Sequence, residues 1–135
     1  MRGLGADDPY WEALGRGELS LQSCSGCKKW NWPPVFRCGE CGSWEQKWKP
    51  RPLYGTVYSW TRTWHDFGAP ARLVPPFASV LVEVDGPGSV RLLGIMEASD
   101  ADKVSIGQNV EGSIGQAMFQ GETVPVIEWR NKAST

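Results

Sequence analysis

Hydrophobic and polar residues change their spacing along the chain. Near its start, Tyr10, Trp11 and Leu14 fall on one face of a helical turn, and the preceding Asp8-Pro9 is a favourable helix start. From residue 53 onward, β-branched and aromatic residues alternate with polar ones in short runs bounded by turn residues. The pattern predicts a short amphipathic N-terminal helix within residues 1–18 and a mainly β chain behind it. Because so short a helix is marginal alone, its apolar face must pack on this chain or on a partner.

The β region contains five such runs, which predict strands at residues 53–62, 77–85, 89–98, 110–119 and 123–130. A helix cap is expected at Ser99-Asp100, between the third and fourth strands. Five strands with a short insert after the third are the layout of an OB-fold barrel, with another small five- or six-stranded barrel as the alternative. We therefore predict an OB-fold domain over residues 53–135.

All cysteines occur in two Cys-x-x-Cys pairs separated by ten residues, namely Cys24, Cys27, Cys38 and Cys41. Two such pairs facing each other supply a closed tetrahedral metal site, and their spacing predicts a rubredoxin-like zinc ribbon over residues 19–49. Residues 28–37 are expected to form a short hairpin with Pro33-Pro34 at its turn, and Pro50-Arg51-Pro52 a stiff linker. Since four thiolates fill the coordination shell, the expected role of the metal is structural.

Other interpretations of the cysteines remain open. Iron, with an electron-transfer function, fits the same ligands, because a tetrahedral thiolate set does not distinguish the two metals. Disulfides would require an oxidising compartment, and a redox pair would more often be a single Cys-x-x-Cys in a βαβ context.

Composition and charge narrow the classes of protein. The 135 residues are 41% hydrophobic with a net charge of −1, which indicates a globular chain and argues against one that wraps nucleic acid over its whole surface. Residues 21–52 nevertheless carry six basic and two acidic side chains, either a solvated surface or a site for a phosphate or another acidic group. The longest apolar runs, such as residues 80–82, are too short to span a membrane, and no secretory signal is recognisable, so we expect a cytoplasmic protein.

No catalytic constellation is recognisable in the sequence. It lacks a phosphate-binding glycine loop, a paired-histidine metal motif and a Gly-x-Ser-x-Gly elbow. His65 is the single histidine, within the long connection at residues 63–76, where OB folds commonly line a ligand surface. We therefore expect a protein that is not itself an enzyme.

The order of these motifs resembles a known family. Asp8-Pro9-Tyr10-Trp11 precedes the cysteines, the strand Leu-Tyr-Gly-Thr-Val-Tyr-Ser-Trp-Thr-Arg follows at residues 53–62, and Ile-Gly-Gln-Asn-Val stands at residues 106–110. This arrangement resembles the acyl-CoA-associated family known as domain of unknown function 35, a zinc ribbon joined to an OB fold. The resemblance extends from about Asp8 to Arg130.

The resemblance implies a non-catalytic subunit that binds and stabilises a thiolase-fold enzyme of lipid or steroid metabolism: a thiolase, a synthase or a steroid side-chain aldolase. It further implies zinc at the four cysteines, a two-plus-two heterotetramer and a share in the passage for the acyl-CoA. Whether the partner condenses or cleaves its substrate stays open. Candidates for the passage or the interface are Tyr10, Trp11, Trp32, Phe36 and His65. The alternative function is a single-stranded nucleic-acid-binding protein, because its ribbon is basic and rich in tryptophan.

Overall fold

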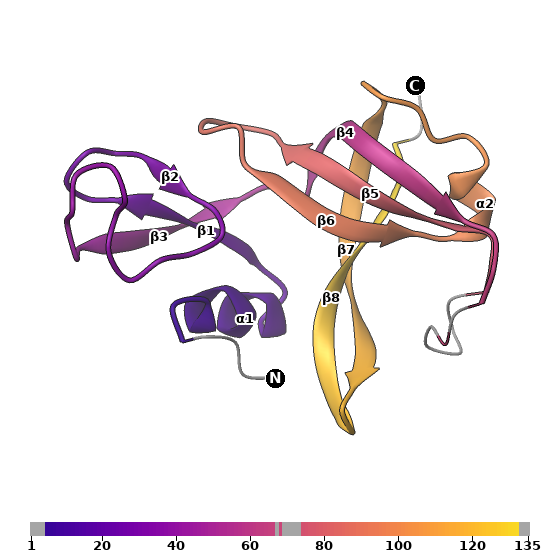
Figure 1. Ribbon diagram of the computed structural model, residues 1–135, viewed down its shortest axis with the longest axis horizontal. Helices are drawn as coiled ribbons and strands as arrows, with labels where there is room; N and C mark the ends of the chain where they lie inside the picture. Colours follow the sequence, from indigo (N-terminus) through magenta and orange to yellow (C-terminus); the bar gives the residue numbers. More distant parts are fainter. Residues whose placement is uncertain (1–4, 67, 69–73, 133–135) are drawn as a thin grey trace.

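The computed structural model describes residues 5–66, 68 and 74–132, which form two β-structures and two short helices (Figure 1). The first β-structure is a three-stranded antiparallel sheet of order β2-β1-β3. Its strands are β1 (Leu19–Cys24), β2 (Trp30–Asn31) and β3 (Gln46–Arg51). The helix α1 (Asp8–Gly15) precedes this sheet and lies beside β1, on the side from which the β7–β8 hairpin projects.

The second β-structure is a closed five-stranded barrel of order β4-β5-β6-β8-β7. Its elements are β4 (Tyr54–Thr63), β5 (Phe77–Val84), β6 (Arg91–Met96), β7 (Asn109–Phe119) and β8 (Glu122–Asn131), with the short helix α2 (Ala98–Ala101) after β6. All neighbouring strands are antiparallel except β6 and β8, whose parallel register is defined by one pair, Ile95 opposite Glu128. The mainly β fold with a barrel of OB type confirms the predicted fold class.

Aliphatic side chains from every barrel strand fill its interior. Val57, Val80, Val82 and Val110 are each no more than 1% exposed. Two glycines let the wall close tightly, because a Cβ at Gly55 would lie 2.1 Å from a backbone oxygen of β5 and one at Gly94 would lie 2.4 Å from the ring of Trp129. The apolar core continues past the barrel to α1, whose Tyr10 and Leu14 belong to the same buried cluster. The apolar face of α1 thus packs on the body of this chain.

Three local predictions need correction. The hairpin expected within residues 28–37 is absent, because β2 pairs with β1, placing Asn31 opposite Gln22. The linker expected at residues 50–52 is wrong at Pro50 and Arg51, which end β3 opposite Ser20 and Leu19. The insert helix begins at Ala98, one residue before the expected cap, with Glu97 at its N-cap position. The other strand ends lie within two residues of their predicted positions.

None of the helices in the described part of the chain has the length and hydropathy needed to cross a lipid bilayer.

Candidate metal centre and apolar groove

The sulfur atoms of the four cysteines converge at one end of the three-stranded sheet. All four Sγ atoms lie within 4.8 Å of one another, with Cys24 and Cys41 at 3.5 Å and Cys27 and Cys38 at 3.7 Å. A disulfide requires about 2.05 Å, so the sulfurs are separate thiols. Metal–sulfur bonds of about 2.3 Å in a tetrahedron separate the sulfurs by about 3.8 Å, so this donor set fits a tetrahedral metal ion.

Two matching backbone turns hold the thiols in place. In the first, the Cys24 carbonyl accepts from Lys28 N and the Cys24 N–H donates to Lys29 O, at 2.9 and 2.8 Å. In the second, the Cys38 carbonyl accepts from Gly42 N and the Cys38 N–H donates to Ser43 O, both at 2.9 Å. Lys28 and Gly42 occupy equivalent positions and both have positive φ, 68° and 77°. The left-handed position is thus a lysine in the first turn and a glycine, which adopts it more readily, in the second.

The thiols differ in how readily they ionise. The backbone N–H groups of Cys41 and Glu40, with a hydrogen bond from the Asn31 side chain, lower the pKa of Cys38 to about 6. The N–H of Lys29 favours the Cys27 thiolate, but burial and the other three thiols outweigh it and raise the pKa of Cys27 to about 11. The lowered pKa of Cys38 favours its thiolate, which is the form that binds a metal ion.

Three of the predicted aromatic candidates pack together at α1. Tyr10 is buried in α1, and its ring meets those of Trp11 and Trp32 edge-on, each at 5.0 Å between centroids. The Trp11 indole N–H donates to Asp7 Oδ2 at 3.0 Å, which ties the ring to the start of the helix. Trp32 follows β2, so the Tyr10–Trp32 contact joins α1 to the ribbon.

An apolar groove of about 270 Å³ lies between α1 and the barrel. None of the residues that line it is charged: Tyr10, Trp11, Leu14, Ser79, Leu93, Gly94, Ile95, Ala117, Val126 and Ile127. We call this feature the α1 groove. At its rim, Leu93 is 72% exposed although it belongs to a barrel strand. Of the sequence candidates, Tyr10 and Trp11 line the groove, whereas the barrel residues were missed.

A buried polar group lies behind the groove floor. Trp129 is 2% exposed, and its indole N–H has no acceptor within the described part of the chain. The ring lies against Gly94, where an added Cβ would come within 2.5 Å of that nitrogen. The sequence contains one sign of an apolar surface on the outside of β6. Leu92 and Leu93 are adjacent, so they place apolar side chains on both faces of the strand.

The remaining two candidates lie away from the groove. The Phe36 side chain is 60% exposed and its ring lies against Gly5. His65 is also exposed, just beyond the end of β4. The long connection that contains it extends to residues 67 and 69–73, which lie outside the described residues. Among the described residues, neither side chain joins the other aromatic candidates.

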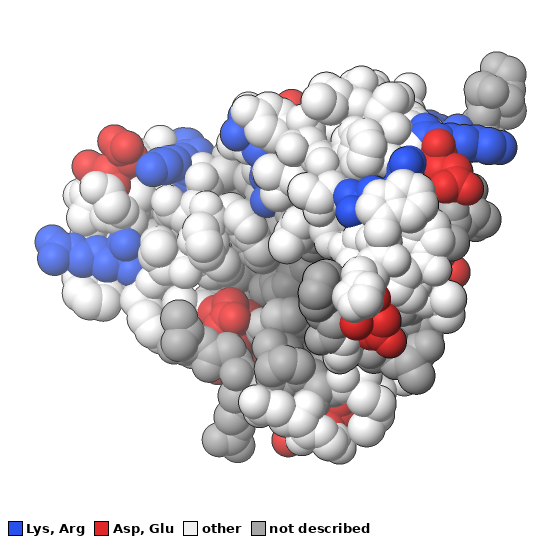
Figure 2. All heavy atoms as spheres, turned by 45° about the vertical axis from the view of Figure 1, so that its right-hand side comes forward, with Lys and Arg blue, Asp and Glu red and all other residues white. Residues whose placement is uncertain are grey.

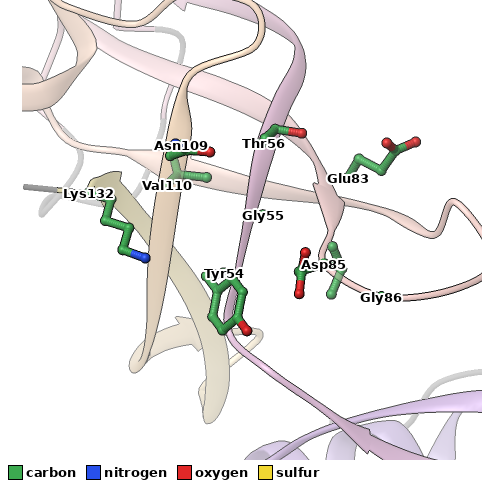
Figure 3. Close-up of a pocket in the computed structure, with 10 residues that line it drawn as sticks. Tyr54, Gly55, Thr56, Glu83, Asp85, Gly86, Asn109, Val110 and Lys132 are labelled. Carbon is green, nitrogen blue, oxygen red and sulfur yellow. The ribbon is translucent and has the colours of Figure 1, made fainter. Parts of the chain in front are cut away.

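A second, polar depression of about 280 Å³ lies where β4 begins and β5 ends (Figure 3). Lys132 and Asp85 approach from opposite sides of Tyr54, and the Lys132 amine is 5.4 Å from the centroid of the Tyr54 ring. Glu83 lies on the β5 side of the depression, as Asp85 does, and pairs with Arg91 at 3.5 Å. Since Glu83 is paired with Arg91 and Asp85 lies across from Lys132, the depression has no excess of positive charge to hold a phosphate.

Charge is unevenly distributed over the surface. On the face shown in Figure 2, basic side chains lie in the upper part and at the left, whereas the lower part carries uncharged and acidic side chains. Within the ribbon, Lys47 and Lys49 are exposed, and neither has a carboxylate within 4.0 Å among the described residues. The basic segment expected from the sequence therefore includes two cations on β3 without a carboxylate partner within the described residues, of which Lys49 lies 5.7 Å from the centroid of the Trp30 ring.

A four-thiol ribbon followed by a closed five-stranded barrel defines a zinc-ribbon/OB-fold protein. Residues 11–45 match the rubredoxin-like zinc ribbon domain of ChsH2, and residues 48–114 match the C-terminal OB-fold domain of ChsH2. The chain belongs to this family, the domain of unknown function 35.

Two solved structures place the whole chain in the same fold. A chain of the "Ltp2-ChsH2(DUF35) aldolase" is 25% identical with a TM-score of 0.74, covering 94% of this chain and 98% of its own. A DUF35 protein of unknown function from Sulfolobus solfataricus is 18% identical with a TM-score of 0.61, covering 96% and 87%. No curated protein matches the sequence closely enough to count as a relative.

Proposed function

We propose that this protein is a non-catalytic subunit of a thiolase-fold acyl-CoA enzyme, which it binds and stabilises in a two-plus-two complex. The observation that carries the proposal is the end-to-end similarity to a chain of an aldolase complex, with 94% and 98% of the two chains aligned. A match over both β-structures, including the junction between them, is more specific than a match of either common fold alone.

The metal, which we propose is zinc, stabilises the ribbon and takes no part in the reaction. All four thiols lie within ligand distance of one ion, so no coordination position is left for water or substrate. Zinc rather than iron agrees with the description of the matched domain as a zinc ribbon. Thiolate ligands require a reducing compartment, which supports a cytoplasmic location.

The α1 groove is our candidate for this subunit's share of the acyl-CoA passage. Its walls are uncharged and apolar, so they suit an acyl chain and exclude a phosphate. Lys47 and Lys49 on the ribbon are the corresponding candidates for the phosphate groups. The aldolase class of the partner is the most direct expectation, because the similar complex is an aldolase.

Co-purification from the native host tests the subunit role. Tagged full-length protein is isolated, and the bound proteins are identified and quantified by mass spectrometry. We expect a thiolase-fold enzyme in near-equal amount. Recovery of the protein alone, or with nucleic acid, would contradict the proposal, and the second result would favour the alternative function.

A matched pair of variants tests the groove within the reconstituted complex. Leu93 and Ile106 are both 72% exposed, but Leu93 alone lines the α1 groove. We expect Leu93→Asp to lower kcat/KM for the acyl-CoA about tenfold, because a carboxylate in the groove repels an apolar chain. Ile106→Asp should have little effect. Equal effects of the two variants would exclude the groove from the passage while leaving the subunit role intact.

A further inference from the structure

Three consecutive residues between the cysteine pairs contact three different parts of the molecule. We call Trp30, Asn31 and Trp32 the bridging segment. It begins directly after the first metal turn, where Lys29 O accepts from the Cys24 N–H at 2.8 Å. Trp30 and Asn31 form β2 and pair with β1, so the metal turn fixes the register of the segment.

Trp30 connects the segment to the barrel. The connection between β5 and β6 packs on its ring so closely that a Cβ at Gly88 would lie 2.5 Å from it. The Arg51 guanidinium stacks on the same ring at 4.5 Å and donates from Nη2 and Nε to the carbonyl oxygen of Asp85, at 2.8 and 3.2 Å. Trp30 and Arg51 together therefore clamp residues 85–88, which lead into β6.

Asn31 and Trp32 connect the segment to the metal centre and to α1. Asn31 is 6% exposed, hydrogen-bonds the Cys38 sulfur, and donates to Gln46 Oε1 at 3.1 Å. Trp32 packs edge-on against Tyr10, the buried ring of α1 that lines the groove. Alternate residues of the bridging segment thus reach both sides of the α1 groove: Trp30 contacts the connection that leads into β6, and Trp32 contacts α1.

We propose that metal binding at the four cysteines sets the shape of the α1 groove through the bridging segment. With the metal bound, both tryptophans are held in register and the groove walls keep their spacing. When the metal is lost, the two metal turns no longer hold that register at the Cys24 end of β1, so α1 and the β5–β6 connection are released while the barrel stays folded. The groove is then a metal-dependent feature of the molecule.

Hydrogen-exchange mass spectrometry on the full chain tests this coupling. Metal-loaded protein is compared with protein stripped by a chelator under reducing conditions. We expect exchange to rise at least about tenfold in α1 and in residues 85–90 after metal removal. Exchange should stay unchanged in residues 59–63 of β4, none of which lines the groove. Unchanged exchange in α1 and the connection, or equal loss of protection throughout the barrel, would overturn the proposal.

Single substitutions test the contact of Trp32 with α1 and the contact of Trp30 with the β5–β6 connection separately, without removing the metal. Trp32→Leu should raise exchange in α1 alone, and Trp30→Leu in residues 85–90 alone, each with the metal content of the wild type. Trp44→Leu is the control, since this tryptophan of the same ribbon is 70% exposed. If both bridging variants behave like Trp44→Leu, the segment does not carry the coupling.

Discussion

The three-stranded sheet and the barrel differ in what fills their interiors. All six residues of β1 are buried, yet Ser20, Gln22 and Ser23 among them are polar. Gln22 satisfies both ends of its amide on the backbone of Val35, donating at 2.8 Å and accepting at 3.0 Å. The barrel interior is instead aliphatic, with valines from β4, β5 and β7.

This difference separates two sources of stability. Apolar burial contributes roughly 25 cal/mol for each Å² removed from water, and the barrel has a continuous core to supply it. Leu19 and Leu21 of β1 join that core, but beyond them the ribbon buries polar groups such as Gln22 and Asn31, whose hydrogen bonds contribute only about 1 kcal/mol each. A structural zinc site contributes on the order of 10 kcal/mol in comparable small domains, so the ribbon should depend on its metal and the barrel should not.

The largest expected effect is loss of the metal. Cys38→Ser removes the buried ligand whose thiolate is best stabilised, so the ribbon should lose both metal and structure while the barrel remains folded. Elemental analysis measures the metal content, and amide exchange locates the unfolding. In the complex proposed above, the same variant should lose its partner.

Ser25→Ala is the matched control, because Ser25 lies in the first metal turn and supplies no thiolate. It should keep one metal ion per chain. If Cys38→Ser retains a protected ribbon, hydrogen bonds rather than metal binding stabilise that sheet.

Gly94→Ala should have the opposite effect, damaging the barrel and sparing the ribbon. The new methyl group would lie 2.4 Å from Cδ1 of the buried Trp129, and neighbouring barrel residues leave the ring little room to move. We expect a loss of about 3 kcal/mol in the free energy of unfolding, with the metal content unchanged. Denaturant titration measures the loss.

Gly39→Ala is the control in the ribbon, where an added Cβ meets no atom within 4 Å. It should leave both stability and metal content near those of the wild type. A similar loss from the two substitutions would mean that glycine flexibility, rather than contact with Trp129, accounts for the effect of Gly94→Ala.

The features predictable from sequence are those encoded over short distances. The metal ligands follow from two Cys-x-x-Cys pairs, and the barrel strands from local alternation bounded by glycine and proline. Asp8-Pro9 likewise places the start of α1 to within one residue, although Asp7 rather than Asp8 occupies the N-cap position. In each case one short stretch contains the whole signal.

The features missed depend on residues that are distant in sequence. Arg51 looked like part of a linker because its acceptor, the carbonyl of Asp85, belongs to the β5–β6 connection. The α1 groove forms only when the N-terminal helix meets β6 and β8, so the local signal at Leu92-Leu93 could not by itself locate it. Tertiary contacts, rather than local propensity, determined these positions.

The junction between the two regions should respond to Gly88→Ala. Gly88 has a φ of 95°, and a Cβ there would lie 2.5 Å from Trp30, so the substitution combines backbone strain with a clash. We expect a loss of about 2 kcal/mol and faster exchange in residues 85–90, with the metal still bound. Denaturant titration and amide exchange measure the two effects.

Gly17→Ala separates strain from clash. Gly17 has a φ of 84°, but an added Cβ would meet no atom within 4 Å. We expect this control to cost about 1 kcal/mol, from backbone strain alone. If it costs as much as Gly88→Ala, the contact with Trp30 contributes nothing to the junction.

The smallest expected effect is a pH dependence of stability caused by Tyr10. This residue belongs to the buried core that joins α1 to the barrel, and its ring packs on Trp32 of the ribbon. Burial raises the pKa of Tyr10 to about 12, from 10.0 in the unfolded chain. Below pH 10 the phenol is protonated in both states and stability is unaffected. As the pH rises from 10 to 12 the unfolded state loses its proton first, so the free energy of unfolding should fall, by about 1.4 kcal/mol at pH 11.

Tyr10→Phe should remove this decrease in the free energy of unfolding at alkaline pH. Tyr54→Phe serves as the control, because the Tyr54 ring is 43% exposed. Denaturant midpoints at pH 9 and pH 11 give the comparison. Because Tyr10 packs on Trp32, metal-free protein offers a second test: release of α1 should expose the phenol and reduce its contribution. The wild type, Tyr10→Phe and Tyr54→Phe could instead lose the same free energy of unfolding between pH 9 and pH 11. That result would mean that folding does not raise the pKa of Tyr10 and that α1 is packed less firmly than its contacts indicate.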